Sequence, residues 1–201
     1  MRVNRNSIRV FVPAAVCLSM VVMASARVNN GEFAHIRIQN FGCVNENYYR
    51  GAQPRGGDYA ALAGLGIKTV VDLERKGEAE EQRMVESNGM KFFRIAMDTS
   101  SRPAREAVDE FLRIVNDRAN QPVFVHCHGG RHRTGVMTAV YRMSQQNWTA
   151  RQAHDEMRQY EFDKGFGHGA LKDYVYDYYA QIEVMRDEGR NSGVARGAGN
   201  K

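Results

Sequence analysis

The chain has 201 residues, enough for one domain or at most two small ones. Hydrophobic residues make up 43% of it and charged residues 25%, which excludes a wholly disordered, collagen-like or multi-span membrane chain. The formal net charge is +5, but three arginines and no acid in residues 1–26 leave +2 for the remainder. Because no basic stripe with interleaved aromatic side chains is present, we expect no nucleic-acid partner.

Residues 1–26 have the three parts of a secretory signal peptide. Three arginines lie within residues 2–9, a mostly apolar run covers Val10–Met23, and the small residues of Ala24–Ala26 offer a cleavage site. We therefore expect an exported protein, periplasmic or secreted. The run is short for a spanning helix and contains Pro13. The alternative is an uncleaved N-terminal anchor, and membrane contact is expected only in that case.

The chain has 3 cysteines, too few for a disulfide scaffold. Removal of the leader leaves Cys43 and Cys127 as thiols, and export would expose both to an oxidising environment. The sequence leaves open whether a disulfide between them regulates Cys127.

The first half of the remaining chain alternates strand-like and helix-like segments. An irregular lead-in covers residues 27–43, although His35–Gln39 alternates polar and apolar residues like a strand. The segments that follow are predicted as strand, helix, strand, helix and strand: Tyr48–Gly51, Tyr59–Leu65 capped by Asp58, Lys68–Leu73, Glu78–Ser87 and Lys91–Met97.

The second half continues this alternation. A helix at Pro103–Asn116, a continuous apolar strand at Pro122–His126 and three further helices are predicted: Thr134–Ser144, Thr149–Tyr160 with a capping box, and one from the glycine-bearing loop 164–169 to Arg186. The alternation predicts an α/β fold with a central, mainly parallel sheet flanked by helices. We place the domain at residues 44–187 and a flexible tail at 188–201.

The segment Val123–Gly135 has the most informative sequence, VFVHCHGGRHRTG. A cysteine followed six positions later by an arginine is weak evidence alone. Here, however, Cys127 ends a buried strand, two glycines lie within the loop, and Arg133 is followed by Thr-Gly and an apolar helix. A strand, a glycine-containing loop and a helix N-terminus together form a phosphate-binding cradle.

The loop residues have definite expected roles. Backbone N–H groups of residues 128–133 turn toward one point, because Gly129 and Gly130 tolerate the φ values that this needs. The Arg133 guanidinium clamps two phosphate oxygens, and the same positive field favours the nucleophilic thiolate of Cys127. The expected substrate contacts come from His128, Gly129, Gly130, Arg131, His132 and Arg133.

Two neighbouring residues complete the expected site. The Thr134 hydroxyl donates to the sulfur, which helps the sulfur to leave in a second step. His126 orders the loop by hydrogen bonds. The histidines around Cys127 lack the paired spacing of a structural zinc site, so we expect neither a metal nor a cofactor.

The segment resembles the signature loop of the cysteine-based phosphatases, His-Cys-x5-Arg-Ser/Thr, particularly that of the small atypical dual-specificity type in plants, fungi and bacteria. Tyr49–Pro54 (YRGAQP) and Gly66–Leu73 (GIKTVVDL) resemble an N-terminal motif and a buried strand of that family. Trp148 and Ala153–Met157 resemble its helix after the loop, so the likeness spans about residues 44–185. The resemblance implies the fold of the dual-specificity phosphatases.

The resemblance also implies a mechanism with two steps. The cysteine attacks phosphorus to give a phosphocysteine, which water then hydrolyses. An aspartate protonates the leaving group and afterwards activates the water. The family pattern places this acid after the strand Lys91–Met97, so Asp98 is the preferred residue. Asp109, on a helix face, and Asp163, in the loop after the capped helix, are its rivals.

The predicted activity is hydrolysis of phosphate monoesters on phosphotyrosine or dual-specificity protein substrates. The cationic residues Arg131, His132 and His128 resemble loops of relatives that act on inositol phosphates or phosphoinositides, so these substrates are the alternative. Arg131 could equally brace the loop or point to solvent. A sulfurtransferase is disfavoured because its Cys–Arg loop is shorter. A non-catalytic phosphate-binding module is disfavoured because Cys127 and Arg133 are both intact.

Overall fold

The computed structural model describes residues 33 and 35–197, with side chains as far as residue 188. One sheet has the strand order β1-β2-β5-β3-β4. β2, β5, β3 and β4 are mutually parallel, whereas β1 joins the β2 edge antiparallel. The strands are β1 (Gly42–Asn45), β2 (Tyr48–Ala52), β3 (Thr69–Glu74), β4 (Lys91–Met97) and β5 (Val123–Cys127). The predicted central, mainly parallel sheet is confirmed.

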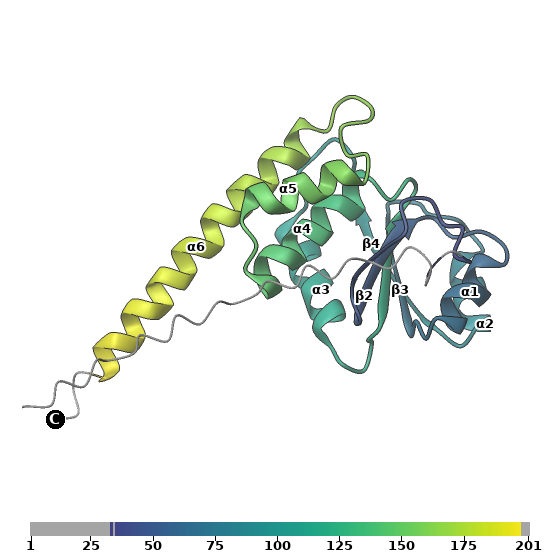
Figure 1. The fold of residues 1–201 in the computed structure, drawn as a ribbon, viewed down its shortest axis with the longest axis horizontal. Helices are drawn as coiled ribbons and strands as arrows, with labels where there is room; N and C mark the ends of the chain where they lie inside the picture. The colour runs from purple at the N-terminus through teal and green to yellow at the C-terminus, as the bar shows by residue number, and fades with distance from the viewer. Residues whose placement is uncertain (1–32, 34, 198–201) are drawn as a thin grey trace, which may run out of the picture.

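Helices cover both faces of this sheet (Figure 1). They are α1 (Asp58–Gly64), α2 (Glu81–Ser87), α3 (Arg105–Asn116), α4 (His132–Gln146), α5 (Ala150–Gln159) and α6 (Gly169–Gly197). Helices α1 and α2 pack on one face, α3 and α4 on the other, and α5 and α6 form a further layer on α4. Among the described residues, no helix combines the length and the apolar character needed to cross a membrane.

The alternation of side chains along β5 divides the two cores. Val123, Val125 and Cys127 belong to the core that contains residues of α3 and α4, whereas Phe124 belongs to the core with α1 and α2. His126 stacks beside Phe124, with ring centroids 5.7 Å apart, so it lies on the α1–α2 side. Because neighbouring strand residues face opposite ways, Cys127 and His126 necessarily have different surroundings.

Helix α4 is buried on two sides. Met137 and Val140 pack on the sheet, whereas Val136, Ala139 and Met143 pack against α5 and α6. This double burial explains its apolar sequence and fixes the N-terminus of α4 directly after the loop that follows β5. The capping box at Thr149 is confirmed: Thr149 Oγ1 accepts from Gln152 N–H and Gln152 Oε1 accepts from Thr149 N–H.

The N-terminal elements differ from the sequence prediction in two places. His35–Gln39 is not a strand; its apolar residues Ile36 and Ile38 pack into the α1–α2 core, and its link to β2 is the hydrogen bond from Ala52 N–H to the Gln39 carbonyl. Gly42–Asn45 forms the strand that pairs with β2. Asp58 is the first residue of α1 rather than its cap. Its carboxylate accepts a hydrogen bond from Arg55 N–H, 2.8 Å away, and no side chain caps the helix.

The C-terminal helix is longer than the sequence predicts. Helix α6 continues to Gly197, beyond the end predicted at Arg186 and through most of the predicted tail. Residues 188–197 contain no proline, so the helical backbone can continue from the preceding turns despite the glycines. The predicted signal peptide, residues 1–26, lies outside the described residues and stays a prediction.

The sheet also keeps the two described thiols apart. Cys43 pairs with Tyr49, Tyr49 pairs with Phe124, and Cys127 lies three residues further along β5. At about 3.3 Å per residue and about 4.8 Å per strand, the two Cα atoms are roughly 14 Å apart. A disulfide needs less than about 7 Å. This fold therefore does not permit the pairing of Cys43 with Cys127 that the sequence left open.

Candidate active site

The predicted nucleophile lies at the carboxyl end of the central strand. Cys127 is the last residue of β5 and is 3% exposed. It lines a pocket of about 390 Å³ together with residues of β3, the β4–α3 loop and the Cys127–Arg133 loop: Glu74, Thr99, His128, Gly129, Arg131, His132 and Arg133. The carboxyl ends of parallel strands are the usual place for ligands in open α/β sheets.

The loop carbonyls after Cys127 are all bound from outside the pocket. The His128 carbonyl accepts from Gln53 N–H at 3.3 Å, and the Gly129 carbonyl accepts from Asn40 Nδ2 at 2.8 Å. The Gly130 carbonyl accepts from Arg50 Nη2 at 2.5 Å. In a trans peptide, the C=O and the next N–H point in opposite directions. The N–H groups of residues 129–131 therefore point away from these donors, as an anion cradle requires.

Gly130→Ala is expected to disrupt this loop. Gly130 has φ +64°, and an added Cβ would lie 2.5 Å from the Gly51 carbonyl carbon and 2.6 Å from Ala52 N. A left-handed φ and overpacking each cost about 1–3 kcal/mol. We expect a lower Tm and a loss of about 10²-fold in aryl phosphate turnover, the effect of losing one transition-state donor.

The neighbouring glycine supplies the matched control for that measurement. An added Cβ at Gly129 meets nothing nearer than the Arg131 side chain, at 3.7 Å. Gly129→Ala should therefore keep most of the wild-type turnover. Equal losses in the Gly129 and Gly130 variants would contradict the proposed loop geometry.

Arg133 is held at the floor of the pocket by backbone and by one carboxylate. Its Nη1 lies 3.4 Å from the Leu73 carbonyl oxygen and 3.5 Å from that of Met97, and its Nη2 lies 3.7 Å from Glu74 Oε2. Its Nε is buried without a hydrogen-bond partner in the described structure. The ends of β3 and β4 thus fix this guanidinium and leave a donor for a phosphate oxygen.

Thr134 lies in the first turn of α4, with its side chain fully buried. Its Oγ1 has no hydrogen-bond partner among the described atoms. A buried hydroxyl normally finds a partner, so an unused one beside the loop supports the proposed donation to the Cys127 sulfur.

His126 acts on the loop through a chain of contacts rather than directly. Its Nε2 lies 2.9 Å from Glu81 Oε1, on the opposite face of the sheet from Cys127. The same Glu81 oxygen accepts from Gln53 Nε2 at 2.7 Å, and the Gln53 N–H donates to the His128 carbonyl. The ordering contacts on the loop therefore come from Gln53, Asn40 and Arg50.

Asp72, Glu81 and His126 are buried, and their ligand atoms lie within 4.8 Å of one another. The Arg94 guanidinium already lies 2.8 Å from Asp72 Oδ2 and 3.9 Å from Glu81 Oε2. Burial raises the pKa of Asp72. Burial also acts to raise the pKa of Glu81, but its contact with His126 prevails and holds that pKa below its usual value. The described groups thus form a buried ion network in which Arg94 provides the cation.

The preferred acid, Asp98, is not among the residues that line the pocket, although its neighbour in the chain is. It follows β4 directly and precedes Thr99, which lines the pocket. Both carboxylate oxygens are bound by Arg75, through Nε at 2.8 Å and through Nη2. Neither rival lines the pocket: Asp109 pairs with Arg105 along α3, and Asp163 pairs with Arg158 of α5.

The three basic residues that are predicted to contact the substrate have different surroundings. Arg131 lines the pocket and is braced by Glu161, with Nε 2.9 Å from Oε2. His132 Nε2 lies 3.0 Å from the carbonyl oxygens of Phe162 and Lys164, so its ring anchors the α5–α6 loop. Burial, together with the charge of the nearby His168, lowers the pKa of His132. This favours a neutral ring there at neutral pH.

His128 is the third predicted contact and its side chain is largely exposed. Its Nδ1 lies 3.9 Å from Glu74 Oε1. Glu74, at the end of β3, therefore faces both His128 and Arg133. The sequence prediction ended that strand at Leu73 and missed this carboxylate.

The sequence also missed Asn40 and Arg50, which hold the loop from behind. Asn40 has φ +53° and follows a segment wrongly predicted as a strand. Arg50 is part of the family-like motif Tyr49–Pro54, but the motif alone assigns it no role. The available signal was an arginine inside a predicted short strand. The structure buries every residue of that strand, and a buried arginine needs a specific partner.

Comparison with known proteins supports the assignment suggested by the loop. The profile of the tyrosine phosphatase family matches residues 35–193. The chain therefore belongs to the tyrosine phosphatase family, and its loop is that of the cysteine-based members.

The similar proteins are named either inositol diphosphatases or tyrosine-protein phosphatases. The chain is 32% identical over 126 residues to inositol diphosphatase DSP2 of Oryza sativa subsp. japonica, covering 60% of this chain and 61% of the relative. It is 30% identical over 135 residues to a Dictyostelium discoideum protein named probable tyrosine-protein phosphatase DG1060, covering 65% of this chain and 81% of the relative. It thus spans less than two thirds of the first relative.

The structural likeness extends over most of the described fold. The crystal structure of the core catalytic domain of the PP-IP phosphatase SIW14 from S. cerevisiae has a TM-score of 0.63 and 26% identity. The match covers 77% of this chain and 94% of that domain. The predicted fold and family are confirmed.

Proposed function

We propose that this protein hydrolyses phosphate groups of inositol polyphosphates or inositol diphosphates through a phosphocysteine on Cys127. In the first step the Cys127 sulfur attacks phosphorus while the alcohol or phosphate leaving group takes a proton from Asp98. In the second step Asp98 accepts a proton from water, which attacks phosphorus and releases the sulfur as a thiolate and the phosphate product. Arg133 and the loop N–H groups stabilise the charge on the transferred group.

The residues that line the pocket favour a substrate with several phosphate groups. Arg131 and His128 share the pocket with Cys127 and Arg133, and none of its lining residues is phenylalanine, tyrosine or tryptophan. Extra cations favour a substrate with several phosphates, whereas a phosphotyrosine ring gains from an aromatic neighbour. Similarity to proteins named inositol diphosphatases supports the same choice. The observations support this alternative better than the phosphoprotein substrates that the sequence favoured first.

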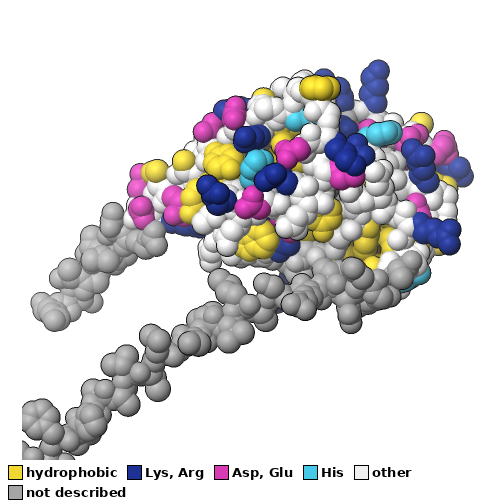
Figure 2. All heavy atoms as spheres, turned by 45° about the horizontal axis from the view of Figure 1, so that its top comes forward, with side chains coloured by type: hydrophobic (Ala, Val, Ile, Leu, Met, Phe, Trp, Pro, Cys, Tyr) yellow, Lys and Arg dark blue, Asp and Glu magenta, His cyan; other side chains and the backbone are white. Residues whose placement is uncertain are grey.

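The charge pattern outside the pocket favours a local mode of recognition. Figure 2 turns the upper part of Figure 1 forward and shows basic, acidic and histidine side chains intermixed there. A mixed surface produces no broad positive field. Attraction for a polyanion therefore depends on the few cations that line the pocket.

Arg131→Ala tests this substrate class. We expect kcat/KM for an inositol polyphosphate to fall about 10–100-fold, because one or two charge-assisted hydrogen bonds are lost. Turnover of an aryl monophosphate should change by less than about threefold, because its single phosphate is bound by the loop and Arg133. Phosphate release from a panel of an aryl phosphate, phosphopeptides and inositol polyphosphates measures both effects.

Arg158→Ala is the matched control, because Arg158 is an exposed arginine on α5 that pairs with Asp163 and does not line the pocket. It should leave all substrates unaffected. If the Arg131 variant loses equal kcat/KM on aryl phosphate and inositol polyphosphate, Arg131 does not select substrates with several phosphates. Preferential turnover of phosphotyrosine peptides by the wild type would instead support phosphoprotein substrates. Similarity to the relative named probable tyrosine-protein phosphatase would agree with that result.

A further inference from the structure

Arg50 is a fully buried arginine beside the catalytic loop. It lies on β2 opposite Val125, and Ala52, two residues further, lies opposite Cys127. Its Nη2 donates to the Gly130 carbonyl at 2.5 Å. Since this carbonyl and the Arg131 N–H belong to one trans peptide, the hydrogen bond also fixes the direction of that N–H.

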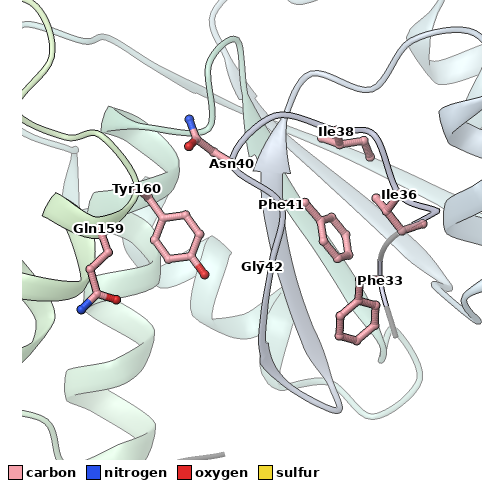
Figure 3. Close-up of a pocket in the computed structure, with 8 residues that line it drawn as sticks. All are labelled: Phe33, Ile36, Ile38, Asn40, Phe41, Gly42, Gln159 and Tyr160. Carbon is pink, nitrogen blue, oxygen red and sulfur yellow. The ribbon is translucent and has the colours of Figure 1, made fainter. Parts of the chain in front are cut away.

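Tyr160 holds the guanidinium from the other side. The Arg50 Cζ lies 3.8 Å from the centroid of the Tyr160 ring, a cation–π contact. Figure 3 shows the Tyr160 side chain reaching from the end of α5 toward Gly42 on β1. A Cβ at Gly42 would overlap the Tyr160 hydroxyl, so the ring fits closely between β1 and Arg50. This packing leaves the guanidinium little freedom to move.

The positive charge of Arg50 lacks a carboxylate partner within the described part of the chain. Its Nε and Nη1 are buried without hydrogen bonds, and it takes part in none of the ion pairs there. The carboxylate whose charge acts on it, Glu156, is bound by Arg142 at 2.5 Å. The titratable groups around Arg50 are Tyr48 on β2, Cys127 on β5, and Glu156 and Tyr160 at α5.

Burial lowers the pKa of the Arg50 guanidinium, and the charges of these neighbours oppose that effect. An arginine nevertheless stays protonated in proteins. A buried cation without its own counter-ion favours anionic forms of the groups near it. Beside this loop, those forms are the Cys127 thiolate and a phosphate bound in the pocket.

We propose that Arg50 is a positioning residue of the phosphatase reaction, acting through the Gly130 peptide and through its charge on the Cys127 thiolate. This inference rests on the proposed function for its role in turnover, but its effect on the thiol does not depend on the substrate. Arg50 would thus have a role in the reaction although it does not line the pocket and lies outside the Cys127–Arg133 loop.

The pH dependence of Cys127 alkylation by iodoacetamide measures this effect without a substrate. Arg50→Met removes the charge and keeps an unbranched apolar side chain. We expect the midpoint of the alkylation profile to rise by about one pH unit, so that alkylation below the midpoint is about tenfold slower. Arg50→Lys keeps the charge and should leave the midpoint near that of wild type. Its kcat should fall, because lysine lacks the planar contact with Tyr160 and the loop.

Tyr48→Phe is the matched control. Tyr48 is a fully buried residue of the same strand and face, and its hydroxyl contacts Thr138 of α4 rather than the loop. Its alkylation profile should equal that of wild type, which separates the effect of Arg50 from general loosening of β2. Near-UV circular dichroism verifies the fold of each variant.

Two results would overturn the proposal: a folded Arg50→Met protein with the wild-type alkylation midpoint, or a folded Arg50→Lys protein with the midpoint raised by a full unit. If Arg50→Met does not fold, Arg50→Gln, which also removes the charge, takes its place in the same comparison. If wild type releases phosphate from none of the substrates while its alkylation still depends on Arg50, the proposed function fails and the effect on the thiol stands.

Discussion

Cys127→Ser is expected to abolish phosphate release, with a loss of at least about 10⁴-fold, the scale seen when a nucleophile is removed from an enzyme. The hydroxyl of serine is not ionised near neutral pH, so the cradle would hold a phosphate without an effective nucleophile. The measurement is phosphate release from an aryl phosphate under conditions that saturate the wild type.

Cys43→Ser is the control for this experiment. Cys43 is the other cysteine of the described chain, and it lies on β1, on the opposite side of the sheet from Cys127. This variant should keep wild-type turnover. A Cys127→Ser protein with wild-type rates would show that the reaction does not pass through a phosphocysteine.

Asp98→Asn is expected to slow the release of poor leaving groups by about 10²–10⁴-fold, the range for loss of a general acid. An aryl phosphate whose phenol leaves without protonation should lose much less. A series of aryl phosphates with increasingly basic leaving groups measures this directly.

The rival aspartates supply matched controls. Asp109 and Asp163 have exposed side chains and pair with Arg105 and Arg158. Asp109→Asn and Asp163→Asn should therefore show the wild-type dependence on the leaving group. If Asp163→Asn or Asp109→Asn shows the steep dependence and Asp98→Asn does not, the acid has been assigned to the wrong residue.

Much of the fold could be predicted because several strands are either continuously apolar or bounded by clear turns. β4 has the predicted bounds, and β5 differs from its prediction by a single residue at each end. The errors arose where tertiary contacts override the local pattern. His35–Gln39 alternates like a strand, but it is linked to β2 by the hydrogen bond from Ala52 N–H to the Gln39 carbonyl rather than by a ladder, and Ile36 and Ile38 cover the α1–α2 core.

The loop itself was predictable, whereas its supports were not. Cys127, Gly130 and Arg133 follow from a short motif whose physical demands are local. Asn40 contacts the loop across 89 residues of sequence, and Glu81 acts on it through Gln53. Neither residue has a local pattern that predicts this role. Only the strand order, which places β2 and β3 on either side of β5, reveals which residues meet the loop.

The substrate contacts show the same limit. Arg131, His132 and His128 form one cationic run in the sequence, but α4 begins at His132 and the three side chains diverge. His132 turns to the α5–α6 loop, Arg131 meets Glu161, and His128 faces Glu74. A sequence motif fixes which charges are near the loop, while the helix start decides which of them reach a ligand.

A crystal structure with vanadate, a mimic of the pentacoordinate phosphorus, tests the central claim most directly. It should show vanadium bonded to the Cys127 sulfur, its oxygens on the N–H groups of residues 129–131, and the guanidinium of Arg133 closing the ring. Vanadate bound away from that sulfur, or loop carbonyls rather than amides facing it, would contradict the account.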